Sequence, residues 1–292
     1  MSRFNLLIIA ILCCLLPSCE HVNIADIEEA NDPNTAKEFK GNLQIRVSQL
    51  EQTPLSTITR TGLTDVCNRL NFAIYNLSAS RVKQTNQVLG DTSFGTAAFQ
   101  LDEGNYQLVV LAHSSNGNPT MTDPAKIRFT NAQGFTDTFL YNGNISVGAE
   151  PQTHTLTLHR ITALCRFVIK GDIPAEVSRM RFYYTGGSGA FNAATGLGSV
   201  NSKQDLKFDV TSGQKEFDLY TYLHNTEGTI HLKAYALDAA DNVYCEREFD
   251  IPLVQGKITL YSGDFFGDGE YESTTSGINL NTDWDGKIEL TF

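Results

Sequence analysis

The first residues whose types and spacing indicate chemistry stand at the N-terminus, where the sequence reads MSRFNLLIIAILCCLLPSC. Arg3 precedes a nearly continuous apolar run over residues 4–16, and a short segment then leads into Cys19. This is the three-part arrangement of a secretory signal. The apolar run is shorter than the roughly 20 residues that a membrane-spanning helix needs. The arrangement resembles a bacterial lipobox, and it predicts a signal over residues 1–18 and lipid attachment at the thiol of Cys19.

An ordinary cleavable signal peptide is the alternative, since Cys13 and Cys14 show that cysteine also occurs inside the apolar run. A polar segment follows Cys19 directly, with no second small-residue cleavage site, and this favours the lipoprotein interpretation. Each buried methylene group of an acyl chain contributes about 0.8 kcal/mol, and two chains make anchoring stable. The sequence therefore predicts a protein tethered to a membrane outside the cytoplasm.

A glycine-rich stretch at residues 185–190, TGGSGA, is the next candidate for chemistry. Ala190 stands where the last glycine of a GxSxG nucleophile elbow would be. Gly196 and Gly198 do not complete a GxGxxG dinucleotide motif either. We expect a long flexible loop here.

An acidic cluster follows at Asp264, Asp268, Glu270 and Glu272. A calcium loop needs oxygen ligands at its first, third and fifth positions and a glutamate at its twelfth. Counted from Asp264, the third position is Phe266 and the twelfth is Thr275. The cluster is therefore expected to be a solvated acidic loop, and we predict no metal site.

Cysteine and histidine spacing gives no further site. After removal of the signal and lipidation of Cys19, Cys67, Cys165 and Cys245 remain, without a CxxC pair. Cys165 and Cys245 lie in apolar strand-like runs and are expected to be buried small hydrophobic residues, although one disulfide among the three stays open. The six histidines are dispersed and form no HExxH motif. No catalytic residue, metal or cofactor is predicted, and we expect a protein that is not an enzyme.

The charge balance excludes another class of partner. Removal of residues 1–18 takes away one of the 22 basic residues and none of the 33 acidic ones, so the formal net charge falls from −11 to −12. The Lys and Arg residues do not cluster, whereas binding of phosphates needs a basic patch. A nucleic-acid partner is therefore not expected.

The elements that would carry any site are strands. Residues 19–41 are polar, acidic and interrupted by Pro33, which indicates a flexible tether. From Leu43 onward apolar and polar residues alternate with the period of a half-buried strand. In residues 70–76, for example, Leu70, Phe72 and Ile74 are expected to share one face. The clearest strands are predicted at residues 70–76, 106–112, 153–158, 161–170, 217–223, 230–236, 243–251 and 288–292.

Two finer expectations follow from the same pattern. The strand at 153–158 is expected at the edge or end of a sheet, because its sequence, THTLTL, alternates β-branched and polar residues. At most one or two short helices are expected, for example at residues 264–270. Trp284, the only tryptophan, is expected to cap the core of the second half, and a role as a partner-binding anchor is its alternative.

A weak internal repeat divides the chain. EGNYQLVVLA at residues 103–112 shares its Glu, Gly, Leu and final Ala with EGTIHLKAYA at residues 227–236. Short strands separated by turns in two similar halves predict two tandem β-sandwiches. We place the N-terminal sandwich at residues 42–158 and the C-terminal sandwich at residues 159–292.

Taken together, these features carry a family resemblance. The lipobox, the acidic tether and the late Trp284 accompany the stretches LHRITA at 158–163, REFDIP at 247–252 and GKITLYSGDFF at 256–266. The chain thereby resembles the fimbrillin superfamily of Bacteroidales type V pili, and within it the branch of anchor or accessory fimbrial subunits.

The resemblance implies an all-β fold of two transthyretin-like, Greek-key β-sandwiches. It also implies lipid anchoring of a surface-exposed protein to the outer membrane through Cys19, and participation in a fimbrium that mediates adhesion to host or bacterial surface ligands. Other fimbrial subunits would be partners through donor-strand exchange. Stalk subunits of the family are cut after an Arg in the first domain, and Arg46 and Arg60 are both candidates here. Anchors commonly escape that cut, and residues 288–292 are expected to be an integral last strand.

Three interpretations thus stand beside one another. The first is a lipid-anchored anchor or accessory subunit, and the second is a polymerising stalk subunit activated by cleavage at Arg60. The third, from another class, is a surface glycan-binding lipoprotein. Its sugar platforms would be exposed aromatic residues, with the candidates Tyr183, Tyr184, Tyr220 and Tyr222, although packing of these tyrosines against neighbouring strands is the favoured interpretation.

Overall fold

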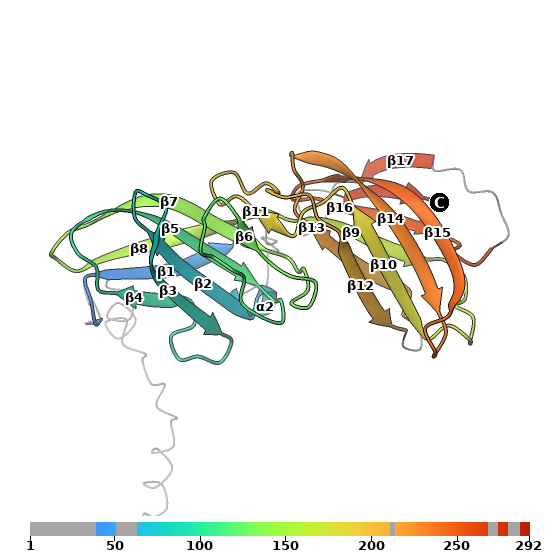
Figure 1. Cartoon of the computed structure of the whole chain (residues 1–292), viewed down its shortest axis with the longest axis horizontal. Helices are drawn as coiled ribbons and strands as arrows, with labels where there is room; N and C mark the ends of the chain where they lie inside the picture. The colour runs from blue at the N-terminus through green and yellow to red at the C-terminus, as the bar shows by residue number, and fades with distance from the viewer. Residues whose placement is uncertain (1–38, 51–62, 211–213, 268–273, 280–286) are drawn as a thin grey trace, which may run out of the picture. The chain divides into compact units, whose positions relative to one another are not determined.

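Strands form nearly all of the regular structure, which confirms the predicted all-β class. The computed structural model describes residues 39–50, 63–210, 214–267, 274–279 and 287–292 (Figure 1). Residues 40–292 form one compact unit, and all that follows concerns this unit. The described part of the chain contains one helix, α2 (Leu63–Val66), and no helix long and apolar enough to cross a membrane.

The first β-sandwich uses the strands before residue 161. A four-stranded antiparallel layer has the order β3-β2-β5-β7, and a second layer has the order β8-β1-β4. The layers join where β7 pairs with β8 at Phe139 and Leu140. The strands are β1 (Leu43–Leu50), β2 (Arg69–Tyr75), β3 (Arg81–Val88), β4 (Thr96–Phe99), β5 (Gly104–His113), β7 (Phe139–Val147) and β8 (Gln152–Arg160).

The second β-sandwich uses the strands from residue 163 onward, in sheets of order β12-β10-β14-β15 and β13-β9-β16-β18-β17. Phe167 lies at the centre of its core, with its ring centroid 5.0 Å from that of Phe292 and 5.3 Å from that of Phe182. The strands are β9 (Ala163–Ile169), β10 (Arg179–Thr185), β12 (Gln204–Asp209), β13 (Glu216–Thr221), β14 (Glu227–Leu237), β15 (Val243–Val254), β16 (Ile258–Gly263), β17 (Thr274–Asn279) and β18 (Lys287–Thr291).

A third hydrophobic core joins the two sandwiches. It contains Tyr75 and Leu111 from the outer face of the first sandwich and Phe191 and Tyr222 from the second half. The short strands β6 (Ile127–Arg128) and β11 (Ala190–Phe191) pair across the two halves at the same place. The Tyr222 hydroxyl lies 3.1 Å from that of Thr138. The two sandwiches therefore share buried surface, and the exact domain boundaries at 42–158 and 159–292 stay a prediction.

The face assignment of the first predicted strand is confirmed, with one addition. In β2, Leu70, Phe72 and Ile74 belong to the core of the first sandwich. Ala73 and Tyr75, on the opposite face, are buried as well, because the third core covers them. Alternation alone cannot indicate this second burial, since the covering residues come from the other half of the chain.

The glycine-rich stretch is not the flexible loop that its composition predicts. It leads into β11, and a Cβ atom on Gly187 would lie 2.0 Å from Oγ1 of Thr221. Gly186 has φ +89°, and its missing side chain leaves room for the carbonyl of Thr229. Glycine is used here for close approach between chains.

Two other expectations are corrected in part. The described residues of the expected helix at 264–270 form a bend at 264–267, where the Asp264 carboxylate accepts the backbone N–H groups of Phe266 and Gly267. The strand predicted for an edge, β8, pairs with β1 along its length, and with β7 only at His159 and Arg160. It is therefore the end strand of its own layer but is not a free edge of the whole sheet.

Candidate strand-exchange site

β1 is the first described strand after the predicted tether, and its side chains alternate between core and solvent. Its alternating side chains place Leu43, Ile45 and Val47 in the first core, while Arg46 and Ser48 point to solvent. In strand addition, backbone hydrogen bonds hold the added strand and pockets receive every second side chain, which is the pattern that β1 shows. β1 is therefore the candidate functional site.

The pairing of β1 holds its layer together. It runs parallel to β8 and antiparallel to β4, and these two neighbours have no pairs with each other (Figure 1). A bulge between Val47 and Gln49 lets the Ser48 hydroxyl donate to the carbonyl of Leu156 at 3.0 Å. The backbone N–H of Val47 donates to Gly95 at 2.8 Å. Removal of β1 would leave β4 and β8 as the two walls of an apolar slot.

The entrance to β1 is fixed by Asn42, whose side chain is buried. Its amide nitrogen donates to the carbonyls of Leu101 and Gly148, both at 2.9 Å, and its amide oxygen accepts the N–H of Leu101 at 3.0 Å. Gly41 precedes it with φ +130°, and a Cβ atom there would lie 2.3 Å from the carbonyl oxygen of Phe99. Gly41 and Asn42 thus fix the course of the backbone where it enters β1.

Only some of the residues predicted from the sequence lie in the described part of the chain. Cys19, Arg60 and Trp284 lie outside the described residues, as do Asp268, Glu270 and Glu272 of the acidic cluster. Arg46 is described and exposed, but it sits inside β1 opposite Thr96 and Thr155. β1 would have to separate from β4 and β8 before a protease could bind the backbone at Arg46.

The last strand packs as an integral part of the second sandwich. β18 runs parallel to β16 and also pairs with β17. Leu290 and Phe292 are buried in the core around Phe167. Residues 288–292 therefore do not stand free as a spare strand.

A buried polar network, missed by the sequence interpretation, lies at the end of β5. The Nδ1 atom of His113 accepts the N–H of Ser115 at 3.1 Å, so Nε2 donates to the Asn71 side chain at 2.7 Å. The Asn71 amide then donates to Asn86 and Asn118. Burial, together with nearby Arg69, lowers the pKa of His113 to about 3. This ring is thus a neutral structural group, and a lone histidine gives no sequence signal of such a role.

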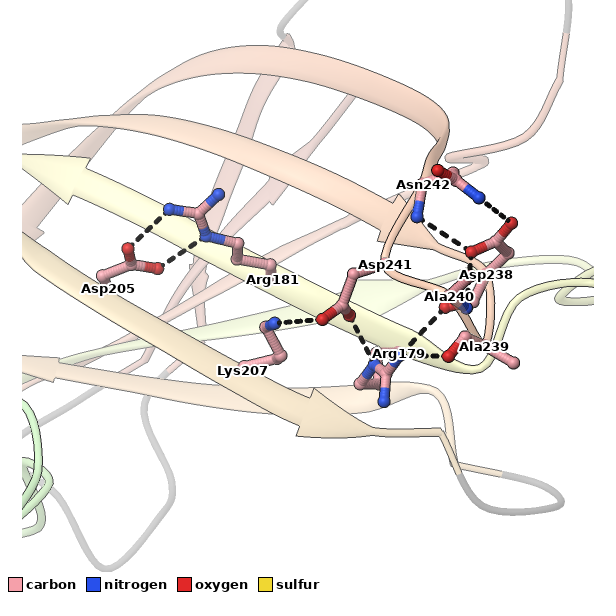
Figure 2. A network of polar contacts seen from close by, with 9 residues as sticks. All are labelled: Arg179, Arg181, Asp205, Lys207, Asp238, Ala239, Ala240, Asp241 and Asn242. Carbon is pink, nitrogen blue, oxygen red and sulfur yellow. Dashed lines mark hydrogen bonds and ion pairs between the residues drawn. The ribbon is translucent and has the colours of Figure 1, made fainter.

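A second polar network, at the β14–β15 turn, lies on the surface of the second sandwich (Figure 2). Asp241, with φ +66°, pairs with Arg179 at 2.8 Å and with Lys207 at 3.1 Å. The Lys207 and Arg179 cations lower the pKa of the Asp241 carboxyl. Asp238 accepts the backbone N–H groups of Ala240 and Asn242, which closes the turn. This network fixes the start of β15.

A shallow groove of about 270 Å³ crosses the outer face of the same sheet. It is lined by Tyr183, His231 and Asp250 together with an ion pair between Lys233 and Glu248. The ring of Tyr183 has the Lys203 ammonium group 5.8 Å from its centroid. The groove is polar and open to solvent.

Of the four tyrosines considered as sugar platforms, Tyr183 lines this groove and the other three do not. Tyr184 and Tyr222 are buried, and burial raises the pKa of both phenols. The Tyr184 hydroxyl donates to the carbonyl of Tyr220 at 2.9 Å, and Tyr220 is half-buried. Tyr184 and Tyr222 are therefore packed, as the favoured interpretation expects, and both complete hydrophobic cores.

The expected burial of Cys165 and Cys245 is found at Cys165 and only in part at Cys245. Cys67 and Cys165 are buried and free, and Cys245 is free and half-buried. Burial raises the pKa of Cys67 to about 12, so this thiol is unreactive at neutral pH. Within the described ranges, no three His, Cys, Asp or Glu side chains are grouped to hold a metal ion.

Comparison with solved structures gives similarities at low sequence identity. The chain is similar to a candidate adhesin from Bacteroides ovatus, with 14% identity over 81% of this chain and 88% of the other, and a TM-score of 0.48. A fimbrial assembly protein from Parabacteroides distasonis is 12% identical over 77% and 91% of the chains, with a TM-score of 0.39. The fimbrial anchor protein Mfa2 from Porphyromonas gingivalis is 10% identical over 70% and 80%, with a TM-score of 0.40.

No curated protein matches the sequence. A family profile does match, and it covers residues 33–292, which include both sandwiches and all the described residues. This chain therefore belongs to the family described as a family of unknown function, DUF6562.

Proposed function

We propose that this protein is a lipid-anchored anchor or accessory subunit of a fimbrium, located at the outer membrane and involved in cell adhesion. Its contacts with other fimbrial subunits form by β-strand complementation. The observation that carries the proposal is β1, a single strand close to the predicted tether that closes the first sandwich between β4 and β8. In β-augmentation, backbone hydrogen bonds supply affinity, and alternate side chains fill pockets and supply specificity.

The lipid on Cys19 is the second part of the proposal. Acyl chains on this residue hold the mature N-terminus at the membrane, and the acidic residues up to 41 act as the tether. Cys19→Ala is expected to abolish acyl labelling and to release the protein from the membrane fraction. Retention of the acyl label in this variant would contradict anchoring at Cys19.

The anchor role is tested in cells that lack the protein. Deletion of the gene is expected to detach fimbriae or to change their length in electron micrographs. Unchanged fimbriae together with loss of growth on one polysaccharide would contradict the anchor role and favour the glycan-binding alternative, with the groove at Tyr183 and His231 as its site.

A polymerising stalk subunit is the second candidate within the same class. Arg60 follows β1 in the sequence, so a cut after it separates β1 from the rest of the chain. N-terminal sequencing of the surface protein distinguishes the candidates. An N-terminus at Cys19 supports the anchor, whereas one at Thr61 supports the stalk.

Strand complementation itself is tested with a peptide. In a chain that is cut at an engineered protease site between β1 and α2, a labelled peptide LQIRVSQL is expected to bind when β1 has been removed. The matched control peptide carries Asp at the positions of Ile45 and Val47, which face the core. Equal binding of both peptides would contradict a slot that selects alternating apolar residues.

A further inference from the structure

The dipeptide Asn-Gly occurs twice in this sequence, at Asn116-Gly117 and at Asn142-Gly143. An asparagine side chain can react with the backbone nitrogen of the residue that follows it, because this nitrogen can reach the Cγ atom. Glycine permits the closest approach, since it has no Cβ atom and adopts the widest range of backbone conformations. The two pairs have the same chemistry, so the structure around each pair decides whether it reacts.

The first pair forms a bend in the loop between β5 and β6, and the side chain of Asn116 is exposed. The backbone N–H of Asn116 donates to the carbonyl of Gln133 at 2.7 Å. Among the hydrogen bonds of the described residues, none engages the Asn116 side chain or the N–H of Gly117. No hydrogen bond between described residues therefore has to break before these two groups can approach each other.

The second pair lies inside β7, which pairs with β5 at this point. Oδ1 of Asn142 accepts the Gln107 amide at 2.7 Å. A Cβ atom on Gly143 would lie 2.5 Å from the hydroxyl oxygen of Tyr141, so the tyrosine ring lies against the glycine. Ring closure needs rotation of the asparagine backbone, and this rotation would break hydrogen bonds of the sheet. Reaction at Asn142 therefore requires local opening of β7.

We propose that Asn116 is a site of spontaneous deamidation in the folded protein, whereas Asn142 is protected by its strand. The Gly117 nitrogen loses its proton to a base in the solvent and forms a bond to Cγ of Asn116. The bond from Cγ to the side-chain nitrogen breaks, and this nitrogen takes up a proton and leaves as ammonia. Water then opens the resulting succinimide ring at either carbonyl, which gives aspartate or isoaspartate. Water is the only co-reactant.

Hydrogen bonds hold the loop on both sides of the first pair. The N–H of Ser115 donates to Nδ1 of His113 at 3.1 Å. On the other side, Oδ1 of Asn118 accepts the Asn71 amide at 2.9 Å. Isoaspartate adds one atom to the backbone between these two held residues, and either product adds a negative charge. The modification thus changes both charge and backbone length beside the buried network of His113.

This modification goes beyond the proposed function and does not depend on it, because it uses neither β1 nor the lipid. The acidic fraction of a purified sample should increase with time. The increase should be faster at higher pH, because base removes the proton from the Gly117 nitrogen.

Peptide mapping tests the selectivity between the two pairs. The intact, lipidated chain in detergent is incubated at pH 7.5 and digested with trypsin, which cleaves after Lys126 and Arg128 and so separates the pairs. Mass spectrometry then measures the converted fraction of each pair. We expect at least tenfold more conversion at Asn116 than at Asn142. An Asn116 that stays unconverted, or that converts no faster than Asn142, would overturn the proposal.

The same chain unfolded in urea is the matched control. Without the pairing of β7 to β5, both Asn-Gly pairs are open to the same reaction, and we expect comparable conversion of the two. A tenfold preference for Asn116 that persists in urea would assign the selectivity to the neighbouring sequence and would overturn protection by the strand.

Two variants supply a second readout. Asn116→Gln would have to form a six-membered ring, which closes much more slowly, so anion exchange of the aged protein should show several-fold less of the acidic form. Asn142→Gln is the matched control, and its acidic form should accumulate as in the parent protein. Undiminished accumulation of the acidic form in Asn116→Gln would overturn the assignment of the site.

Discussion

Asn42 illustrates at the scale of one residue how a polar side chain can define where a strand begins. Its side chain bonds the buried carbonyl and N–H of Leu101 and the carbonyl of the exposed Gly148, which are far away in the sequence. Buried groups of this kind are costly when a partner is removed. The side chain therefore sets the register of β1 as well as contributing stability.

Asn42→Ala is expected to lower the free energy of unfolding by about 1–3 kcal/mol, because it removes this partner from the buried carbonyl and N–H of Leu101. Urea unfolding measures this loss. The matched control is Asn144→Ala, at an exposed position of β7, which should stay within about 0.5 kcal/mol of the parent. Equal losses of stability in the two variants would show that the hydrogen bonds of the Asn42 side chain contribute nothing to stability.

His113 makes stability depend on pH. Its folded pKa of about 3 lies below the ordinary value of 6.5, so between these values the unfolded chain binds a proton that the folded chain does not. Stability contributed by the neutral ring is present above about pH 6.5 and is lost as pH falls toward 3. Denaturant unfolding at pH 7.5 and pH 4.5 should show this loss.

The control for the pH dependence is His113→Asn, which removes the titrating group. This variant should be less stable at pH 7.5, since its network with Asn71 and Ser115 is broken. The further decrease in its free energy of unfolding between pH 7.5 and pH 4.5 should be smaller than the decrease in the parent protein. An unchanged pH dependence would assign the acid sensitivity to other groups.

At the scale of elements, the sequence predicts strands well and their surroundings poorly. β2, β5, β9, β14 and β15 all appear where the alternation of apolar residues places them. The hydrophobic period is local, so it identifies a strand and its core face. It carries no information about a second layer, and for this reason the burial of Tyr75 and Leu111 in the third core could not be predicted.

The glycine-rich stretch at residues 185–190 shows the same limit of prediction from local sequence. Composition alone cannot distinguish a flexible loop from a segment in close contact, because glycine serves both. Only the tertiary structure reveals that Gly187 lies against Thr221. For the candidate site, the alternation in β1 was visible from Leu43 onward, but its position between β4 and β8 depends on parallel pairing over a long sequence separation.

Gly187→Ala is expected to destabilise the protein by about 1–3 kcal/mol, because the new Cβ atom would lie 2.0 Å from Oγ1 of Thr221. The matched control is Gly148→Ala, where no atom lies within 4 Å of the added Cβ. Thermal unfolding of both variants measures the difference. A Gly187 variant as stable as the control would indicate that this segment has room to move.

At the scale of the whole molecule, the third core makes the two sandwiches depend on each other. Phe191 from β11 and Tyr222 from the second half are buried against side chains of β2 and β5. The weak repeat in the sequence indicates two similar halves, but it gives no sign of this shared core.

Phe191→Ala is therefore expected to cost about 3–5 kcal/mol and to weaken both sandwiches, although the residue belongs to the second half of the chain. Hydrogen exchange with mass spectrometry can measure protection in β5 and β9 separately. Loss of protection in both strands is the expected result. Loss confined to β9 would show that the sandwiches unfold independently.

The parallel alignment of β1 with β8 also determines how the protein responds to force. A pull along the axis of β1, applied from its N-terminal side, loads its hydrogen bonds to β8 and β4 together and in shear. Bonds loaded together must break in one event, whereas a strand peeled from one end loses them in succession. Since the lifetime of a protein under force follows its unfolding rate, a tether attached ahead of β1 would meet its greatest resistance at the first strand of the fold.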